Sequence, residues 1–365
     1  MYRTQNSKIL LLSLFVAASA SAASASASAD GLNILLTNDD GYGSYGITAM
    51  FDALDAAGHT VYVSAPASEQ SGKSGSANTD FGATVGFAEE VAGQWSVDGT
   101  PADSVSAGLF GLTPDVLPEG EAIDLVVSGV NDGENISRFV NISGTVGAAM
   151  FALRRGYPVL AVSAGQDIPG RRALGDCFDP PGSCTPQEIG AIFAEIEANA
   201  EAAADNAAAL TVAVINELGE EGIPEGLGLN INVPSGRFST AGTLITKSDN
   251  DQGFDLVLEK NDDGDLEVSA LVVNQILAGL LGGDINPASC PFLPESIRPD
   301  LDSEGAAFAC AYNTIAIFDG NFDSSQDNTD QSKDLACALV GIAELPSFWD
   351  EPNNSNGNKN ICKHR

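Results

Sequence analysis

Short apolar segments alternate with amphipathic segments through the first half of the chain, and this alternation constrains the fold more than any other feature. The apolar runs of strand length are residues 33–37, 60–64, 124–128 and 159–163. Between them, apolar residues recur at helical spacing, for example Ile47, Met50 and Leu54. Apolar strands that alternate with helices favour a parallel sheet covered on both faces. The sequence therefore predicts an α/β fold with a doubly wound, mostly parallel sheet.

Polar residues gather where these strands are expected to end. They are Asp39 and Asp40 after the first run, Ser71 after the second, Asn131 and Asn135 after the third, and Ser143, Gly144 and Thr145 at the next helix start. Sheets of this kind bind ligands at the carboxyl ends of their strands. We therefore expect these four segments to form one site.

The adjacent carboxylates of Asp39 and Asp40 are costly to hold together unless a cation lies between them. With neutral oxygen ligands from Ser71 and Asn131, they would suit a hard cation such as Mg²⁺ or Mn²⁺. Taken alone, residues 38–41 would equally suit a turn followed by a helix cap.

The segment around the expected helix start also has two interpretations. Ser143 would serve as an ordinary N-cap, whereas the amides of Gly144 and Thr145 would form an anion site for a phosphate group. Asn135 would either belong to a turn with Asn131 or contribute to the same anion site. The position of all these residues at strand ends favours the ligand-binding interpretation.

Charge and histidine content exclude several classes of protein. The 365 residues include 16 Lys and Arg against 50 Asp and Glu, a net charge of −34, which repels nucleic-acid polymers. The two histidines are His59, in an expected turn, and the penultimate residue His364. No G-x-S-x-G or G-x-x-x-x-G-K-[ST] motif occurs, so neither a serine hydrolase nor a P-loop enzyme is expected.

The N-terminus has the pattern of a secretory signal peptide over residues 1–29. Arg3 and Lys8 precede an apolar stretch over residues 9–18, and an Ala/Ser run with several cleavage options follows. The apolar stretch is too short to span a bilayer, so no membrane anchor is expected. The sequence predicts an exported protein, periplasmic or secreted, whose mature chain begins between residues 21 and 30.

An even number of cysteines in an exported protein suggests disulfide bonds, although six cysteines allow fifteen pairings. Cys177 and Cys184 flank a short turn and would form a local bridge. Pairing the remaining cysteines in sequence order would give Cys290–Cys310 and Cys337–Cys362.

The second half of the chain gives a weaker pattern. It predicts a helix over residues 187–210, a strand over 229–234, a hairpin of strands 255–259 and 266–268, and a final helix over 335–343. Residues 261–264 suit a hairpin turn better than a calcium loop, because the loop's ligand spacing is missing. We expect a core over residues 30–235, a C-terminal β/α extension of the same domain over 236–350, and a polar tail over 351–365.

Seven short motifs follow one another over about residues 32–235. They are T-N-D-D-G at 37–41, Q-S-G at 70–72, G-T-P-A-D at 99–103, V-S-G-V-N-D-G-E-N at 127–135, S-G-T-V-G-A-A at 143–149, L-A-V-S at 160–163 and N-I-N-V-P at 230–234. Together they resemble the SurE family of metal-dependent 5′/3′-nucleotidases. Residues 311–318 are only a faint echo of a family strand, and residues 165–210 do not align.

The resemblance implies a Rossmann-like fold, one Mn²⁺ or Mg²⁺ per subunit, and a homodimer or homotetramer formed through C-terminal exchange. The implied metal ligands are Asp39, Asp40, Ser71 and Asn131, and the implied phosphate contacts are Asn135, Ser143, Gly144 and Thr145. The implied substrate is a small nucleotide or another phosphomonoester.

In such a site the cation would activate a water for in-line attack on phosphorus, with Asp39 or Asp40 accepting the proton. Asp39 as a covalent phospho-aspartate nucleophile is an alternative mechanism. A non-catalytic exported protein that uses the same cation to bind nucleotides or phosphate is an alternative function. An esterase at the same sheet edge would lack an elbow serine and a placed histidine.

Overall fold

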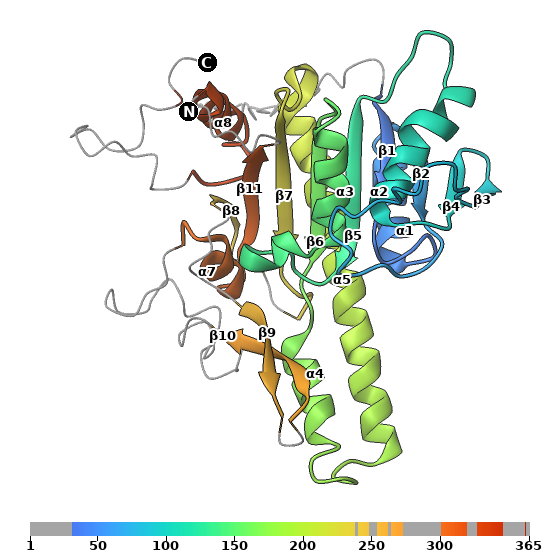
Figure 1. Ribbon diagram of the computed structural model, residues 1–365. Coiled ribbons are helices and arrows are strands. Elements are labelled where there is room, and N and C mark those ends of the chain that lie inside the picture. The colour runs from blue at the N-terminus through green and yellow to red at the C-terminus, as the bar shows by residue number, and fades with distance from the viewer. Residues whose placement is uncertain are drawn as a thin grey trace, which may run out of the picture.

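The computed structural model describes residues 31–237, 240–247, 254–261, 264–272, 301–319, 327–345 and Cys362. Its centre is a nine-stranded sheet with the order β3-β4-β2-β1-β5-β6-β7-β11-β8 (Figure 1). The strands are β1 (Asn33–Thr37), β2 (Thr60–Pro66), β3 (Phe87–Val91), β4 (Gln94–Val97), β5 (Leu125–Asp132), β6 (Val159–Ala164), β7 (Leu227–Val233), β8 (Thr243–Thr246) and β11 (Asn313–Asp319). Strands β4, β2, β1, β5, β6 and β7 run parallel, which confirms the predicted mostly parallel sheet.

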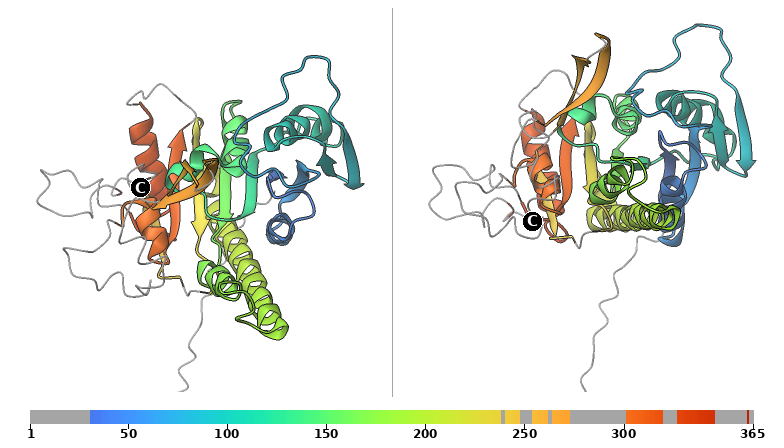
Figure 2. Two further views of the ribbon diagram at one scale, coloured as in Figure 1. Left: turned by 60° about the horizontal axis from the view of Figure 1, so that its bottom comes forward. Right: turned by 90° about the horizontal axis from the view of Figure 1, so that it is seen from below.

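Helices cover both faces of the sheet, as the right-hand view of Figure 2 shows. One face packs against α1 (Tyr45–Ala56), α5 (Pro186–Leu218) and α8 (Asp327–Ala338), and the other against α2 (Pro101–Ala107) and α3 (Gly144–Leu153). The central strands are buried on both sides, because their alternate residues belong to different cores: Ile34 and Leu36 to one, Leu35 to the other. This arrangement is the doubly wound topology.

Helices α2 and α5 begin where the sequence supplies capping boxes. Thr100 and Asp103 form a capping box at the start of α2, with Pro101 in the first turn. Thr185 and Glu188 do the same for α5. Such caps satisfy amides that have no partner within the helix, so they set the first residue of each helix.

The C-terminal extension adds strands to the sheet and a hairpin beside it. Strand β11 pairs antiparallel with β7 and parallel with β8. The predicted hairpin is present as β9 (Phe254–Lys260) paired antiparallel with β10 (Leu266–Val272). Of its predicted turn, residues 262 and 263 lie outside the described ranges, while Gly264 donates its amide to the Asn261 carbonyl at 3.0 Å.

Several elements differ from the sequence predictions. The final helix was expected at residues 335–343, whereas α8 begins eight residues earlier, at Asp327. The first half of α8 is polar, so it has no helical period of apolar residues by which to predict it. Strands β3 and β4 were not predicted, since β3 is an exposed edge strand with two glutamates and β4 is only four residues long. The short helices α4 (Ile168–Asp176) and α7 (Glu304–Ala309) were also missed.

Two of the predicted disulfides are present, Cys177–Cys184 and Cys337–Cys362. Cys310 is disulfide-bonded as well, and its expected partner Cys290 lies outside the described residues. Cys177–Cys184 links the end of α4 to the approach to α5 (Figure 1), at the tip of the arm that these helices form.

The predicted signal peptide, the polar tail apart from Cys362, and His364 lie outside the described residues. Among the helices that are described, none combines the length and apolar character needed to cross a membrane. His59 lies just after α1, where its Nδ1 accepts the Leu32 amide at 3.2 Å, and burial lowers its pKa. It precedes the first residue of β2, at the opposite end of that strand from the loop that holds Ser71.

Candidate metal and phosphate site at the carboxyl edge of the sheet

Asp39 and Asp40 follow β1 directly and lie at the carboxyl edge of the sheet, as predicted. Asp39 is buried, with 3% of its surface exposed, and Asp40 is partly buried. The Asp40 Oδ2 accepts the Asp132 amide at 3.0 Å, which ties the end of β1 to the end of β5. Each carboxylate therefore sits in a defined position rather than in solvent.

The start of α3 meets Asp39 directly. Thr145 Oγ1 donates to Asp39 Oδ1 at 2.5 Å, and the Thr145 backbone amide also favours the charged form of Asp39. Gly144 lies against the other oxygen: a Cβ on Gly144 would come within 2.7 Å of Asp39 Oδ2. Only a glycine allows the helix start to approach the carboxylate this closely.

Ser143 acts as the N-cap of α3, since its Oγ accepts the Val146 amide at 3.0 Å. Ser143 is therefore used as a cap, and its Oγ, which the resemblance assigns to phosphate binding, already accepts a backbone hydrogen bond. The buried start of α3 nonetheless lies beside Asp39, so the helix N-terminus and the carboxylate pair share one location.

Asn135 belongs to the same cluster. It is 7% exposed, and its Nδ2 donates to Thr145 Oγ1 at 3.2 Å and to Ser163 Oγ at 2.9 Å. Thr145 thus receives a hydrogen bond from Asn135 and gives one to Asp39. Ser163, on β6, is a residue of this cluster that the sequence analysis assigned only to a strand.

Asn131 lies on β5 beside Ser163 of β6, with 8% of its surface exposed. Its Nδ2 donates to the Gly133 carbonyl at 2.7 Å. This bond engages the amide nitrogen and leaves the side-chain oxygen as the atom that would face a cation.

Ser71 is exposed in the loop after β2, and it is the least constrained of the predicted ligands. The loop is nevertheless anchored at the site, because the Gln70 amide donates to the Asp39 carbonyl at 2.7 Å. The Ser71 amide in turn donates to Glu69 Oε1 at 2.6 Å. Glu69 is a third carboxylate near the pair, and its charge raises the pKa of both Asp39 and Asp40.

The electrostatics of the pair suit a cation. Burial raises the pKa of Asp39, opposed by the hydrogen bond from Thr145. Burial, followed by the charge of Asp39 and then that of Asp132, raises the pKa of Asp40 to about 7. Because both pKa values are raised, the ionised form of the pair is unfavourable by itself, and a positive charge between the two carboxylates would stabilise it.

The donor set has the character of a hard-cation site. In the described part of the chain, no three His, Cys, Asp or Glu side chains come together in a metal-binding group. A cation at Asp39 and Asp40 would therefore complete its coordination with neutral oxygens, of the kind that Ser71 and Asn131 provide, and with water. Such all-oxygen sites fit Mg²⁺ or Mn²⁺.

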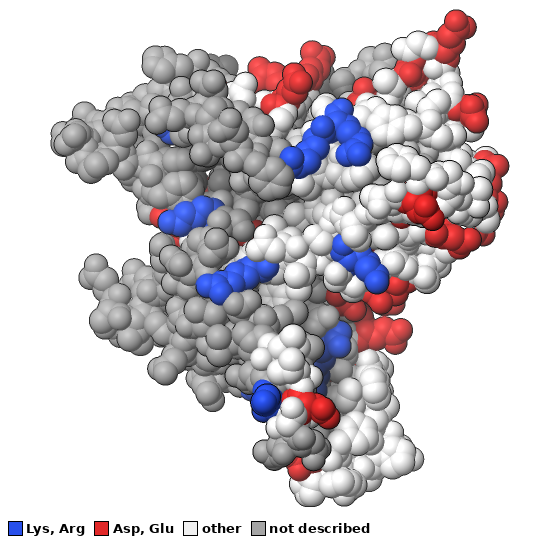
Figure 3. All heavy atoms as spheres, viewed as in Figure 1, with Lys and Arg blue, Asp and Glu red and all other residues white. Residues whose placement is uncertain are grey.

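A cavity of about 520 Å³ lies along the loop that follows β2. Its polar lining includes Gln70, Asn78, Asp98, Thr100 and Asp103, and none of the predicted metal or phosphate residues lines it. Its link to the end of β1 is Gln70, whose amide donates a hydrogen bond to the Asp39 carbonyl. On the face of the molecule seen in Figure 3, acidic side chains gather along the edge near β3 and β4, while Lys and Arg side chains lie over the middle of that face.

Comparison with known proteins agrees with the geometry. The family model described as survival protein SurE matches residues 34–253, more than half of the chain. The 5′-nucleotidase SurE of Syntrophotalea carbinolica is 38% identical over 229 residues, which cover 63% of this chain and 75% of that protein. The 5′-nucleotidase SurE 1 of Chlamydia caviae is 43% identical over 141 residues, which cover 38% of this chain and 49% of that protein.

The chain spans about half the length of the Chlamydia relatives it matches, 49% of the Chlamydia caviae protein and 53% of the one from Chlamydia felis. The crystal structure of the SurE protein from Aquifex aeolicus aligns with a TM-score of 0.54 and 22% identity, over 83% of this chain and 99% of that chain. This last likeness concerns the fold. With the matching family model and the Syntrophotalea relative, the comparisons show that the chain belongs to the SurE family.

Proposed function

We propose that this protein is a metal-dependent phosphatase that hydrolyses nucleoside monophosphates at their 5′ or 3′ phosphate. One observation carries the proposal: the buried Asp39, next to Asp40, is hydrogen-bonded to Thr145 at the start of α3, so the carboxylate pair lies beside a helix N-terminus. A cation and a helix N-terminus are the two features that bind a phosphate dianion in a strongly acidic protein.

Asp39, Asp40, Ser71 and Asn131 would hold one Mn²⁺ or Mg²⁺ per subunit. When bound, a divalent cation supplies charge neutralisation for the phosphate and a lowered pKa for water. Thr145 Oγ1 engages Oδ1 of Asp39, and the Asp132 amide engages Oδ2 of Asp40. The second oxygen of each is left to bind the cation or accept a proton from water.

Asn135 and the start of α3 would bind the phosphate oxygens. Donors that are already in place stabilise the charge that develops on these oxygens during in-line attack. The nucleoside would extend toward the polar cavity that Gln70, the residue before Ser71, helps to line. Its lining of amide, hydroxyl and carboxylate groups suits the hydroxyls of a sugar and the edge of a base.

We further propose that the protein acts outside the cytoplasm, in the periplasm or as a secreted protein, after removal of residues 1–29. The support is the leader-like N-terminus together with disulfides in the described chain, which form and persist in oxidising compartments. A homodimer or homotetramer is the proposed assembly, by analogy with the family.

The test is phosphate release from a panel of 5′ and 3′ nucleoside monophosphates and an aryl phosphate. We expect release with Mn²⁺ or Mg²⁺, its loss in excess chelator and its return when metal is added back. Undiminished turnover in chelator would refute the metal centre. Tight nucleotide binding without phosphate release in any metal would instead identify a binding protein.

A further inference from the structure

A buried carboxylate from the C-terminal extension lies behind the site. Glu304, the first residue of α7, is fully buried. Its Oε1 accepts the side-chain amides of Asn230 at 2.9 Å and Asn232 at 3.2 Å, both on β7. The two asparagines are two positions apart on one strand, so both point to the same face of the sheet and reach the same carboxylate.

The same two asparagines hold the backbone of Asn135. Asn232 Oδ1 accepts the Asn135 amide at 2.8 Å, and Asn230 Nδ2 donates to the Asn135 carbonyl at 2.8 Å. Both polar groups of the Asn135 backbone are therefore engaged by side chains that Glu304 also contacts. The side chain of Asn135 then bonds to Thr145, which bonds to Asp39.

We propose that Glu304 is a positioning residue that orients Asn135 toward the phosphate. It acts through Asn230 and Asn232, which hold the backbone of Asn135, and the Asn135 side chain continues the hydrogen bonds to Thr145 and Asp39. The proposal rests on the function proposed above, since it assigns Asn135 to the phosphate side of the active site.

The chemistry of a carboxylate explains why this position needs one. An ionised carboxylate only accepts hydrogen bonds, so it draws the NH₂ group of each asparagine toward itself. The Asn232 oxygen then faces the Asn135 amide, as its 2.8 Å contact requires. A glutamine at position 304 would bring its own NH₂ group, which permits the asparagine amides to turn over and present a donor to the Asn135 amide.

The test is a double-mutant cycle on turnover in saturating Mn²⁺, with Glu304→Gln, Asn135→Ala and the double variant. We expect Glu304→Gln alone to lower kcat by about 10- to 100-fold, the scale of a misplaced catalytic group, with KM and the Mn²⁺ Kd changed by about threefold or less. Asn135→Ala keeps the backbone contacts and removes only the side chain. In that background, Glu304→Gln should lower kcat by less than about twofold, because the group it positions is gone.

Thr314→Val is the matched control. Thr314 lies opposite Asn232 in the register of β11 and β7, is fully buried, and its hydroxyl has no hydrogen-bond partner among the described residues. This change alters a buried polar side chain beside the network without touching Glu304, so kcat should stay within about twofold of the wild type.

Equal losses of kcat from Glu304→Gln in the wild-type and Asn135→Ala backgrounds would overturn the proposal, since they would indicate a general structural role. If Glu304→Gln does not fold, Glu304→Asp enters the same cycle; it keeps the charge and withdraws the oxygens by one methylene. Wild-type protein without metal-dependent phosphatase activity would instead refute the proposed function itself.

Discussion

Thr145 Oγ1 donates a hydrogen bond of 2.5 Å to Asp39 Oδ1 across a separation of 106 residues in the chain. The bond fixes the carboxylate of β1 against the start of α3, and both side chains are buried. It also favours the ionised form of Asp39, which burial alone would disfavour. The contact therefore joins the proposed cation ligands to the proposed phosphate contacts.

Replacing Thr145 with valine tests this contact. Valine has nearly the same shape but no hydroxyl, so Asp39 becomes harder to ionise and the affinity for Mn²⁺ at pH 7 should fall by about tenfold, the equivalent of one charge-assisted hydrogen bond. Titration calorimetry with Mn²⁺ measures this affinity. Thr145→Ser keeps the hydroxyl and should restore most of it; a serine variant as weak as the valine variant would assign the effect to packing.

Gly144→Ala tests the close approach of α3 to Asp39. The added Cβ would come within 2.7 Å of Asp39 Oδ2 and 2.8 Å of Asp39 Cβ, so the helix start or the carboxylate must move. We expect kcat/KM to fall by about 100-fold or more, as for a displaced catalytic group.

Gly190→Ala is the control for this change. Gly190 lies within α5, where an added Cβ meets nothing within 4 Å. Alanine has the higher helix propensity, so this variant should be fully active and more stable by about 0.5–1 kcal/mol in urea unfolding. Full activity of Gly144→Ala would show that the helix start does not need to contact Asp39.

Asp40→Asn separates a metal ligand from a structural cap. In metal-free buffer the pKa of Asp40 in the folded protein, about 7, lies above the ordinary value of 3.8. Asp40 therefore contributes stability that is complete below pH 3.8 and is lost as pH rises through 7. The wild type should become less stable over this window by a few kcal/mol, as thermal unfolding between pH 4 and 8 would measure. Asp40→Asn should lose less stability over the same window, and what it still loses comes from Asp39, whose pKa burial also raises.

Saturating Mn²⁺ should then stabilise the wild type by mass action and the variant much less, with turnover of the variant reduced about 100-fold or more. If Asp40 only caps the chain, stability would fall in both buffers and the folded variant would remain active.

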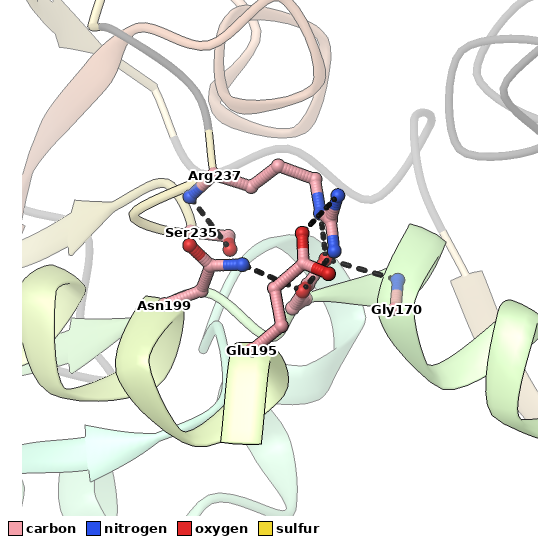
Figure 4. A network of polar contacts seen from close by, with 6 residues as sticks. Gly170, Glu195, Asn199, Ser235 and Arg237 are labelled. Atoms are coloured by element: carbon pink, nitrogen blue, oxygen red, sulfur yellow. Dashed lines mark hydrogen bonds and ion pairs between the residues drawn. The ribbon is translucent and has the colours of Figure 1, made fainter. Parts of the chain in front are cut away.

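A buried ion pair outside the candidate site joins Arg237 to Asp167, in the network drawn around Arg237 in Figure 4. The fully buried side chain of Asp167 accepts from Arg237 at 2.6 and 2.8 Å, from Asn199 at 2.9 Å, and from the Gly170 amide at the start of α4. Burial raises the pKa of Asp167, but the bonds from Arg237 and Asn199 outweigh it and the net pKa is lowered. Its stabilising contribution is thus present above pH 3.8 and lost as pH falls through the lowered pKa.

Asp167→Ala should cost about 2–3 kcal/mol at pH 7, because it removes a cap and leaves Arg237 without its buried partner. Glu195→Ala removes the other carboxylate bound to Arg237, at 3.0 Å but 58% exposed, and should cost less than about 0.5 kcal/mol. Urea unfolding measures both. Equal effects would contradict the assigned difference between the buried and exposed partners.

Local features of the sequence were sufficient for the central strands, for helices α1, α3 and α5, and for placing the candidate site residues at strand ends. Each depends on a short-range cause: an apolar run, a helical period, a capping residue or a tight turn. The Cys177–Cys184 bridge belongs with them, because its two residues flank one turn. Polar edge strands and short helices were missed for the same reason, since β3 is exposed along its whole length and has no apolar period.

The sequence by itself determined which residues meet at the carboxyl edge, because parallel strands end together. Only the tertiary structure decided how they bond: that Thr145 donates to Asp39, that Ser143 is used as a cap, and that Asn135 rests on Asn230 and Asn232. These contacts join segments up to 106 residues apart, and their geometry follows from how helices and strands pack. No local pattern encodes the distance between a helix start and a neighbouring strand, so the bonds of the site appear only when the whole core is assembled.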